Sequence, residues 1–171
     1  MLFNTFNFVF LFLPVSFFCS RIFKNSKNEN FYISLLIIVS FYFYSYFITS
    51  YIFILIFSIF LNFFFGNLLM QIKGYKLRKS LFLFMISINL ISLIYFKYFN
   101  FLVQNLNTLF AQDIFTNKAV ILPLAISFFT FQQIIFLTNV YNKEIKKFKF
   151  LRYVLFISFF PQLIAGPIIK F

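Results

Sequence analysis

The chain has 171 residues, of which 63% are hydrophobic and 11% are charged, and its mean hydropathy is +0.95. So few charges cannot cover the surface of a soluble domain of this length, which excludes a water-soluble globular protein. The formal net charge of +12 would suggest nucleic-acid binding in a soluble chain. Here the basic residues flank apolar runs, as they do in the cytoplasmic loops of membrane proteins. We therefore expect a lipid bilayer as partner and no nucleic acid.

Five apolar runs follow one another, each close to the length needed to cross a hydrocarbon core of about 30 Å. The runs are continuous rather than alternating, which predicts helices and not a barrel. The expected fold is all-α, one polytopic membrane domain over residues 1–171 that ends in a broken segment. The expected crossings are residues 2–20, 31–49, 51–71, 80–96 and 119–142.

The first run carries no positive charge in front of it, so it predicts a retained helix and not a secretory signal. Pro14 lies inside this run and is expected to kink it. The second and third runs are joined by an uncharged turn near Thr49 and Ser50. Residues 98–118 mix aromatic with polar residues, which predicts an interfacial helix followed by a loop.

Three basic clusters follow the first, third and fifth runs. If the amino terminus faces outside, all three clusters fall on the cytoplasmic side, as the positive-inside rule requires. The pattern therefore predicts a multi-pass protein with its amino terminus outside. The clusters are Arg21, Lys24 and Lys27; Lys73, Lys76, Arg78 and Lys79; and Lys143, Lys146, Lys147, Lys149 and Arg152.

Residues that could carry out catalysis are scarce. The chain has no His, and its acids are only Glu29, Asp113 and Glu144, which are dispersed across both sides of the predicted membrane. A Ser–His–Asp arrangement and a metal-ligand cluster are both excluded by this composition. We therefore predict no catalytic residue and no metal site in this chain.

The fifth run is the most polar of the five. Gln133 shares one broad helical face with several hydroxyl side chains, whereas Gln132 and Asn139 fall nearly opposite. Amides that face lipid would leave donors unpaired, so both faces should meet protein or water. These amides are expected either to hydrogen-bond across helices or to line a polar tunnel. Pro123 is expected at the start of this helix, where its missing N–H costs little.

Residues 153–169 form an uncharged segment that is interrupted at Pro161 and again at the pair Gly166 and Pro167. Broken helices at membrane depth occur only where they are buried in protein or line a watery cavity. The clustering of the breaks favours a re-entrant element beside a pocket over an ordinary crossing with proline kinks.

Four stretches of the chain resemble one family, one of them, in looser form, being the opening run from Phe6 to Pro14. LPLAISFFTFQQIIFLTNVYNKEI (residues 122–145), FISFFPQLIAGPIIKF (156–171) and YFKYFNF (95–101) are similar to the membrane-bound O-acyltransferases. The resemblance is strongest to the bacterial branch that contains alginate and peptidoglycan O-acetyltransferases and the D-alanyl transferase of teichoic acids, and it extends along essentially the whole chain.

The resemblance implies transfer of an acyl group, expected to be acetyl, to hydroxyls of a cell-envelope polysaccharide at the bacterial inner membrane. The fold of this family resembles a ring of helices around a funnel that holds a catalytic His, and its members are over twice as long as this chain. No position here matches that His, so the chain is similar to an amino-terminal portion. The residues expected to shape the cytoplasmic entrance, in a structural role, are Gln132, Gln133, Pro161, Gln162, Gly166 and Pro167.

The resemblance also implies acetyl-CoA or an acyl carrier as donor, with no cofactor bound by this part of the enzyme. A cytoplasmic acyl carrier and a periplasmic acetyltransferase are the implied protein partners. Two other functions stay open on the residues alone. One is a transporter component, because broken helices and polar intramembrane residues serve both classes. The other is a non-catalytic remnant or scaffold of the enzyme.

Overall fold

The computed structural model describes residues 5–24, 29–46, 49–110, 120–163 and 166, and every regular element in these ranges is helical. The predicted all-α class is therefore confirmed for the described residues. The elements are the π-helix η1 (Phe8–Phe12), α1 (Leu13–Lys24), α2 (Glu29–Ser45), the 3₁₀-helix η2 (Thr49–Tyr51), α3 (Ile52–Gln71), α4 (Tyr75–Phe110), α5 (Ile126–Tyr141), α6 (Phe150–Ser158) and α7 (Phe160–Leu163).

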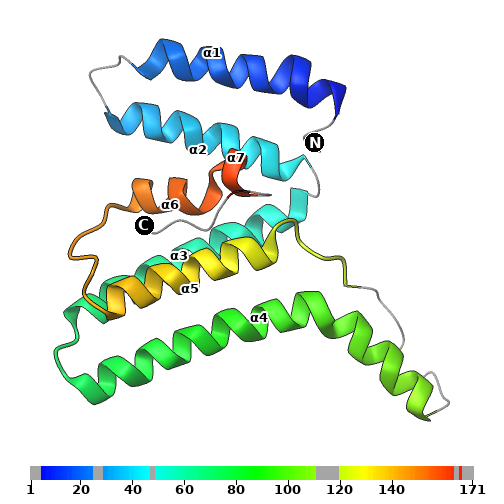
Figure 1. The fold of residues 1–171 in the computed structure, drawn as a ribbon, viewed down its shortest axis with the longest axis vertical. Coiled ribbons are helices and arrows are strands. Elements are labelled where there is room, and N and C mark those ends of the chain that lie inside the picture. The colour runs from blue at the N-terminus through cyan, green and yellow to red at the C-terminus, as the bar shows by residue number, and fades with distance from the viewer. Residues whose placement is uncertain (1–4, 25–28, 47–48, 111–119, 164–165, 167–171) are drawn as a thin grey trace.

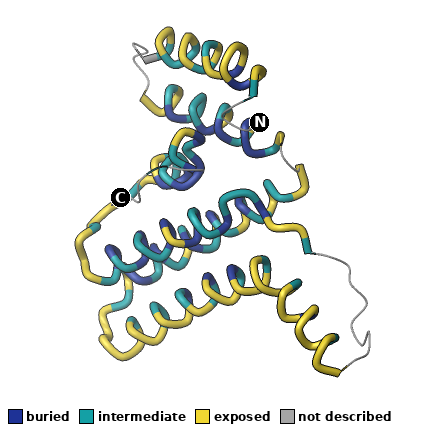
Figure 2. The backbone as a smooth tube through the Cα atoms, turned by 45° about the vertical axis from the view of Figure 1, so that its right-hand side comes forward, coloured by how far each residue is buried: buried dark blue, intermediate teal, exposed yellow. Residues whose placement is uncertain are grey.

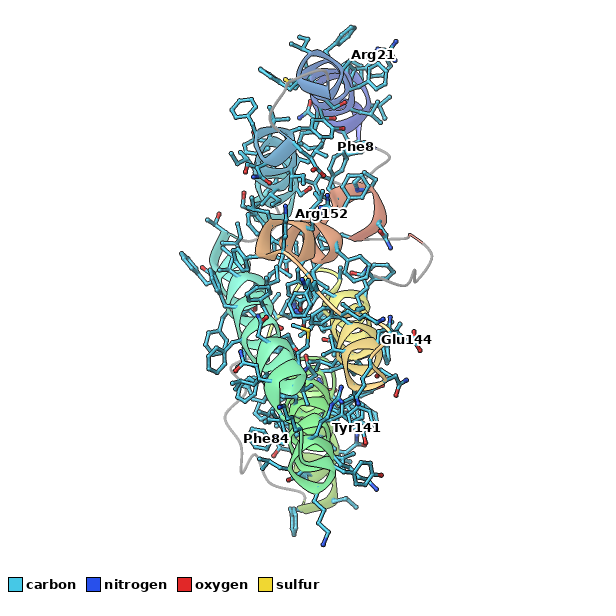
Figure 3. All side chains as sticks on the ribbon, turned by 90° about the vertical axis from the view of Figure 1, so that its left-hand side faces the viewer. Phe8, Arg21, Phe84, Tyr141, Glu144 and Arg152 are labelled. Carbon is cyan, nitrogen blue, oxygen red and sulfur yellow. The ribbon has the colours of Figure 1, made fainter. Side chains whose placement is uncertain are left out.

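The helices lie side by side in a row that runs from α1 through α2, α6 and α7 to α3 and α5, and ends at α4 (Figure 1). The view along the helices shows the same order as a narrow column (Figure 3). Within the row, α5 contacts both α3 and α4, and α6 contacts α2. The described residues thus form an open wall of helices, with two faces available to lipid or to further protein.

Two helices in the described ranges are long and apolar enough to cross a membrane, namely Thr49–Gln71, which includes η2, and Tyr75–Phe110. The apolar helices Phe8–Phe23 and Glu29–Ser45 are shorter. The third predicted crossing, residues 51–71, agrees closely with α3. The number of crossings beyond the two long helices stays a prediction.

Helix α4 corrects the prediction for residues 98–118. Instead of a separate interfacial helix, residues 98–110 continue the helix that starts at Tyr75, which has 36 residues. This stretch contains no Gly or Pro that would end a helix. At 1.5 Å per residue α4 is about 54 Å long, well beyond the hydrocarbon thickness. Figure 1 shows that its second half bends away from the row.

The amino-terminal helix passes Pro14 without a break. The π-helical turn Phe8–Phe12 directly precedes Leu13 and Pro14, and α1 then continues to Lys24. A wider turn gives room to the proline ring and to the carbonyl that loses its N–H partner. The structure has a π-helical turn before Pro14, the kink predicted there stays a prediction, and the helix ends four residues later than the predicted crossing.

Helix α5 begins at Ile126 and not near residue 119 or at Pro123, which corrects the predicted start. Ala125 has a φ of 55°, in the left-handed region that a helix cannot continue through. Tyr51 and Tyr44 donate their hydroxyl protons to the carbonyls of Ile121 (2.7 Å) and Leu124 (3.1 Å), which holds the preceding residues in place. The remaining 16 residues span about 24 Å.

Buried residues concentrate on α5 and also occur on α2, α3 and α6, whereas α1 and α4 are largely exposed (Figure 2). Leu69, Met85, Phe136 and Tyr153 have 0% exposure. The helices approach closely at Gly66, where a Cβ would lie 2.8 Å from Cε1 of the Phe136 ring. The core of this chain is therefore centred on α5.

Candidate functional site

A network of four polar side chains, three of them buried, joins three helices at the centre of the wall. The Asn62 amide on α3 donates to Oδ1 of Asn89 on α4 (3.2 Å) and to Oε1 of Gln133 on α5 (3.0 Å). The Asn89 amide donates back to Oδ1 of Asn62 (2.8 Å), and the Ser58 hydroxyl donates to Oε1 of Gln133 (2.7 Å). We call these four residues, Ser58, Asn62, Asn89 and Gln133, the amide network.

The amide network shows what Gln133 does in this chain. Its side chain, with 0% exposure, hydrogen-bonds to α3, which is the interhelical alternative among the two expected from the sequence. Sequence reasoning missed Asn62 and Asn89. Each is an amide within a predominantly apolar run, and the desolvation cost of such a group is the signal that could have identified them.

Gln132 differs from its neighbour. Its side chain is 1% exposed, and neither its amide nitrogen nor its carbonyl oxygen has a hydrogen-bond partner among the described residues. An unsatisfied buried group of this kind costs about 1–3 kcal/mol. The two glutamines therefore differ in their carbonyl oxygens. Oε1 of Gln133 accepts bonds from α3 while its Nε2 has no partner among the described residues, whereas neither polar atom of Gln132 has one.

The carboxyl-terminal segment is interrupted, but at a different residue from those expected. Helix α6 ends at Ser158, Phe159 adopts φ −55° and ψ 107°, and α7 restarts at Phe160. In a continuous helix the ring of Pro161 would clash with the carbonyl of Ile157, so the chain turns two residues before the proline. Pro161 then lies in the first turn of α7, where no N–H is needed.

The α2 side chain of Ser40 satisfies the backbone at this break. Ser40 has 0% exposure, the Phe160 N–H donates to its Oγ (3.3 Å), and its hydroxyl donates to the carbonyl of Leu36 (2.8 Å). The rings of Phe8, Phe43 and Phe160 pack around the break, with centroids 5.5–6.4 Å apart. The interrupted backbone is therefore sheltered by protein, as irregular backbone in an apolar medium must be.

Three of the expected site residues, Pro161, Gln162 and Gly166, lie in α7 or just after it, next to this break. Pro161 is exposed and lines a cavity of about 440 Å³ between α1 and α2, together with Phe159 and Phe160. Gly166 donates its N–H to the carbonyl of Gln162 (2.9 Å), and a Cβ at Gly166 would lie 2.7 Å from the Cα of Gln162. Pro167 lies outside the described residues.

The structure does not bring all six expected residues to one cavity. Gln132 and Gln133 are buried in α5 and are not among the residues that line the cavity beside Pro161. The part of the chain that the structure describes contains no group of three or more His, Cys, Asp or Glu side chains that could hold a metal ion.

The basic segments gather at one end of the wall. The carboxyl end of α1, the α3–α4 connection and the α5–α6 connection all lie at the left of Figure 1, and Figure 3 looks onto this end. There Arg78 donates to the carbonyl of Val140 (2.8 Å), and Arg152 forms an ion pair with Glu29 (2.6 Å). The basic segments thus share one end of the molecule, and the side of the membrane on which this end lies stays a prediction.

The opposite end is held by side-chain contacts to the backbone. Asn100 on α4 donates its amide to the carbonyl of Val120 (2.7 Å) and accepts the Val120 N–H (2.9 Å). This pair of bonds ties the chain back to α4 after residues 111–119. Along the chain, the connections between the described helices therefore lie in turn at the basic end and at an end without a basic cluster.

Comparisons with known proteins identify bacterial acetyltransferases. The chain is 35% identical to the peptidoglycan O-acetyltransferase of Helicobacter pylori, over 99% of this chain and 37% of the relative. It is 31% identical to the probable alginate O-acetylase AlgI of Pseudomonas aeruginosa, over 100% of this chain and 33% of the relative. No family model and no solved structure matches the chain.

These relatives agree with the two long apolar helices in indicating a membrane protein. The chain spans about a third of the length of the curated relatives it matches. It is therefore a homologue, over its whole length, of bacterial O-acetyltransferases in the membrane-bound O-acyltransferase family.

Proposed function

We propose that this chain is the amino-terminal part of a bacterial membrane-bound O-acyltransferase that transfers acetyl groups to hydroxyls of a cell-envelope polysaccharide. The observation that carries the proposal is the 35% identity to a peptidoglycan O-acetyltransferase over 99% of the chain. A homologous segment of this extent supports a shared fold and a shared place in the enzyme.

The role of this part is to build the membrane-embedded wall of the active-site funnel. The amide network fixes α3, α4 and α5 against one another, and Ser40 fixes the α6–α7 break against α2. Gln132, whose buried amide has no partner among the described residues, is proposed to face the acyl-transfer tunnel of the complete enzyme. Pro161, Gln162, Gly166 and Pro167 are proposed to shape its cytoplasmic entrance.

The reaction of the complete enzyme requires groups that this chain does not supply. In acyl transfer a general base removes the proton of the acceptor hydroxyl, and His is the usual residue for this step. The chain contains no His, so the base is proposed to lie in the remaining two-thirds. Acetyl-CoA or a cytoplasmic acyl carrier is the proposed donor, and a periplasmic acetyltransferase is a proposed partner.

The proposed membrane arrangement has five crossings in the inner membrane and the broken α6–α7 segment as a re-entrant element. Helices α3 and α4 are long enough to cross by themselves, and α1, α2 and α5 are shorter. The gathering of basic residues at one end supports a cytoplasmic position for that end. The amino terminus, at the opposite end in Figure 1, is then outside.

A chimera tests the proposed function. This chain replaces the aligned segment of the Helicobacter pylori enzyme in cells that lack their own peptidoglycan O-acetyltransferase, and ester-linked acetate is released from purified peptidoglycan by mild base. We expect acetate well above that from cells in which the aligned segment is deleted. A chimera that reaches the membrane in the same amount as the intact relative, and yields no acetate while that relative does, would contradict the proposal.

A further inference from the structure

A basic cavity lies at the end of the molecule where the charged segments gather. It has a volume of about 530 Å³ and lies between the end of α3 and the segment that joins α5 to α6. Lys147, Lys149 and Arg152 supply three cations to its wall, and Met70 and Phe148 supply apolar surface. Figure 3 looks onto this end and labels Arg152 at the start of α6.

The charges around this cavity favour an anion. Lys147 and Lys149 are exposed, and Arg152 shares its charge with Glu29 through one of its terminal nitrogens (2.6 Å). The cavity also lies at the amino terminus of α6, whose preceding residue Lys149 provides no side-chain cap. The N–H groups of a first helical turn add a partial positive charge to that of the cations.

A second cavity, of about 230 Å³, adjoins the same turn of α6. All eight of its lining residues are apolar and come from α2, α3 and α6. Phe150 and Leu151, which lie between Lys149 and Arg152 in the chain, are among them. The first turn of α6 thus borders a basic cavity and a wholly apolar one.

A molecule that matches both cavities has an anionic head and an apolar chain. A free phosphate or an acidic protein segment would use the basic cavity and leave the apolar one unused. The position at the end of apolar helices is also where lipid headgroups meet a membrane protein. A basic cavity and an apolar cavity at this position therefore favour a membrane lipid over a soluble anion.

We propose that these two cavities bind one anionic phospholipid, with its phosphate beside Lys147, Lys149 and Arg152 and an acyl chain in the apolar cavity. The inference rests on the proposed membrane arrangement, in which this end lies at the cytoplasmic surface. Such a lipid would brace the α5–α6 connection against α3, next to the broken helix that the proposed function places at the entrance.

The test measures lipid binding to the full chain purified in a neutral detergent, by native mass spectrometry titration with dioleoyl-phosphatidylglycerol and dioleoyl-phosphatidylcholine. We expect phosphatidylglycerol to bind more tightly. A Lys at such a surface contributes a factor of about five in affinity, so K147Q/K149Q should weaken phosphatidylglycerol binding roughly 25-fold. The matched control K76Q/K79Q removes two charges from the same end outside the cavity and should change affinity less than about threefold.

Two further measurements separate the sources of binding. Glu29→Gln, which releases Arg152 from its ion pair, should tighten phosphatidylglycerol binding. Glycerol phosphate, which has the headgroup without the chains, should compete at least 100-fold more weakly than the lipid, on the order of what burying a few CH₂ groups contributes. Helicity by circular dichroism must be unchanged in each variant used for comparison.

Equal binding of phosphatidylcholine, or equal losses in K147Q/K149Q and K76Q/K79Q, would overturn the proposal. Competition by glycerol phosphate or by a polyglutamate peptide as strong as that of the lipid would also overturn it, because the site would then be a general polyanion surface. None of these results bears on acetate transfer by the chimera, so failure of the lipid site and failure of the proposed function can be told apart.

Discussion

Removing Asn62 should loosen the wall by breaking the contacts between its three central helices. Asn62 takes part in three interhelical hydrogen bonds, two to Asn89 and one to Gln133. Interhelical bonds in membrane proteins contribute about 0.6 kcal/mol each on average. Asn62→Leu, which keeps a similar volume, should therefore lower the free energy of unfolding by about 2 kcal/mol. The buried Asn89 keeps its bond to the carbonyl of Met85 (2.8 Å), which limits the loss.

The assay is reversible unfolding in mixed micelles, followed by far-ultraviolet circular dichroism as the SDS fraction rises. Asn67 on the same helix provides a matched control, because its amide donates within α3 to the carbonyl of Phe63 (3.0 Å). Asn67→Leu should change stability by less than about 0.5 kcal/mol. In a double-mutant cycle, the double variant Asn62→Leu/Asn89→Leu should lose clearly less free energy of unfolding than the two single variants lose together. Equal effects of Asn62→Leu and Asn67→Leu, or strict additivity in the cycle, would refute a coupled network.

Two other substitutions test the close contacts in the same assay. Ser40→Ala leaves the buried Phe160 N–H without its acceptor and should cost about 1–3 kcal/mol; a change below about 0.3 kcal/mol would contradict the role of Ser40 at the break. Gly66→Ala places a Cβ 2.8 Å from the buried Phe136 ring and should destabilise by about 1–3 kcal/mol despite the better helix propensity of Ala. Gly74→Ala, where a Cβ meets nothing within 4 Å, is the matched control and should be close to neutral.

The sequence predicted best those elements whose limits are set by local composition. Helix α3 is an unbroken apolar run bounded by an uncharged turn and by Lys73, and its observed range differs from the predicted crossing by one residue at its start. The gathering of basic clusters at one end also follows from the order of charges along the chain. Both features depend on the length and charge of each segment and not on which residues meet in space.

The features that sequence reasoning missed depend on tertiary contacts. The start of α5 is set by a left-handed Ala125 and by hydroxyl bonds from Tyr44 and Tyr51, which lie over 70 residues away. Because proline is excluded from helix interiors, Pro161 predicts that the carboxyl-terminal segment breaks near it. The residue at which the chain turns is set by contacts with Ser40 and the surrounding aromatic rings. No local pattern contains such partners.

The partners in the amide network are also remote in sequence. Asn62 and Asn89 are 27 residues apart, and Asn62 and Gln133 are 71 residues apart. The cost of burying each amide predicts that it has a partner, but only the packing of α3, α4 and α5 determines which one. The sequence therefore indicated that α5 lies inside a bundle and could not identify its neighbours.

The most direct test of this account is the side of the membrane on which each end of the wall lies, because both proposals depend on it. Cys19 is first replaced by Ala, and single cysteines are then placed at Lys76, Lys147 and Asp113. Intact cells are treated with a membrane-impermeant thiol reagent. We expect labelling at position 113 and protection at positions 76 and 147 until the membrane is permeabilised. Labelling of positions 76 and 147 in intact cells, or of only one of them, would contradict the account.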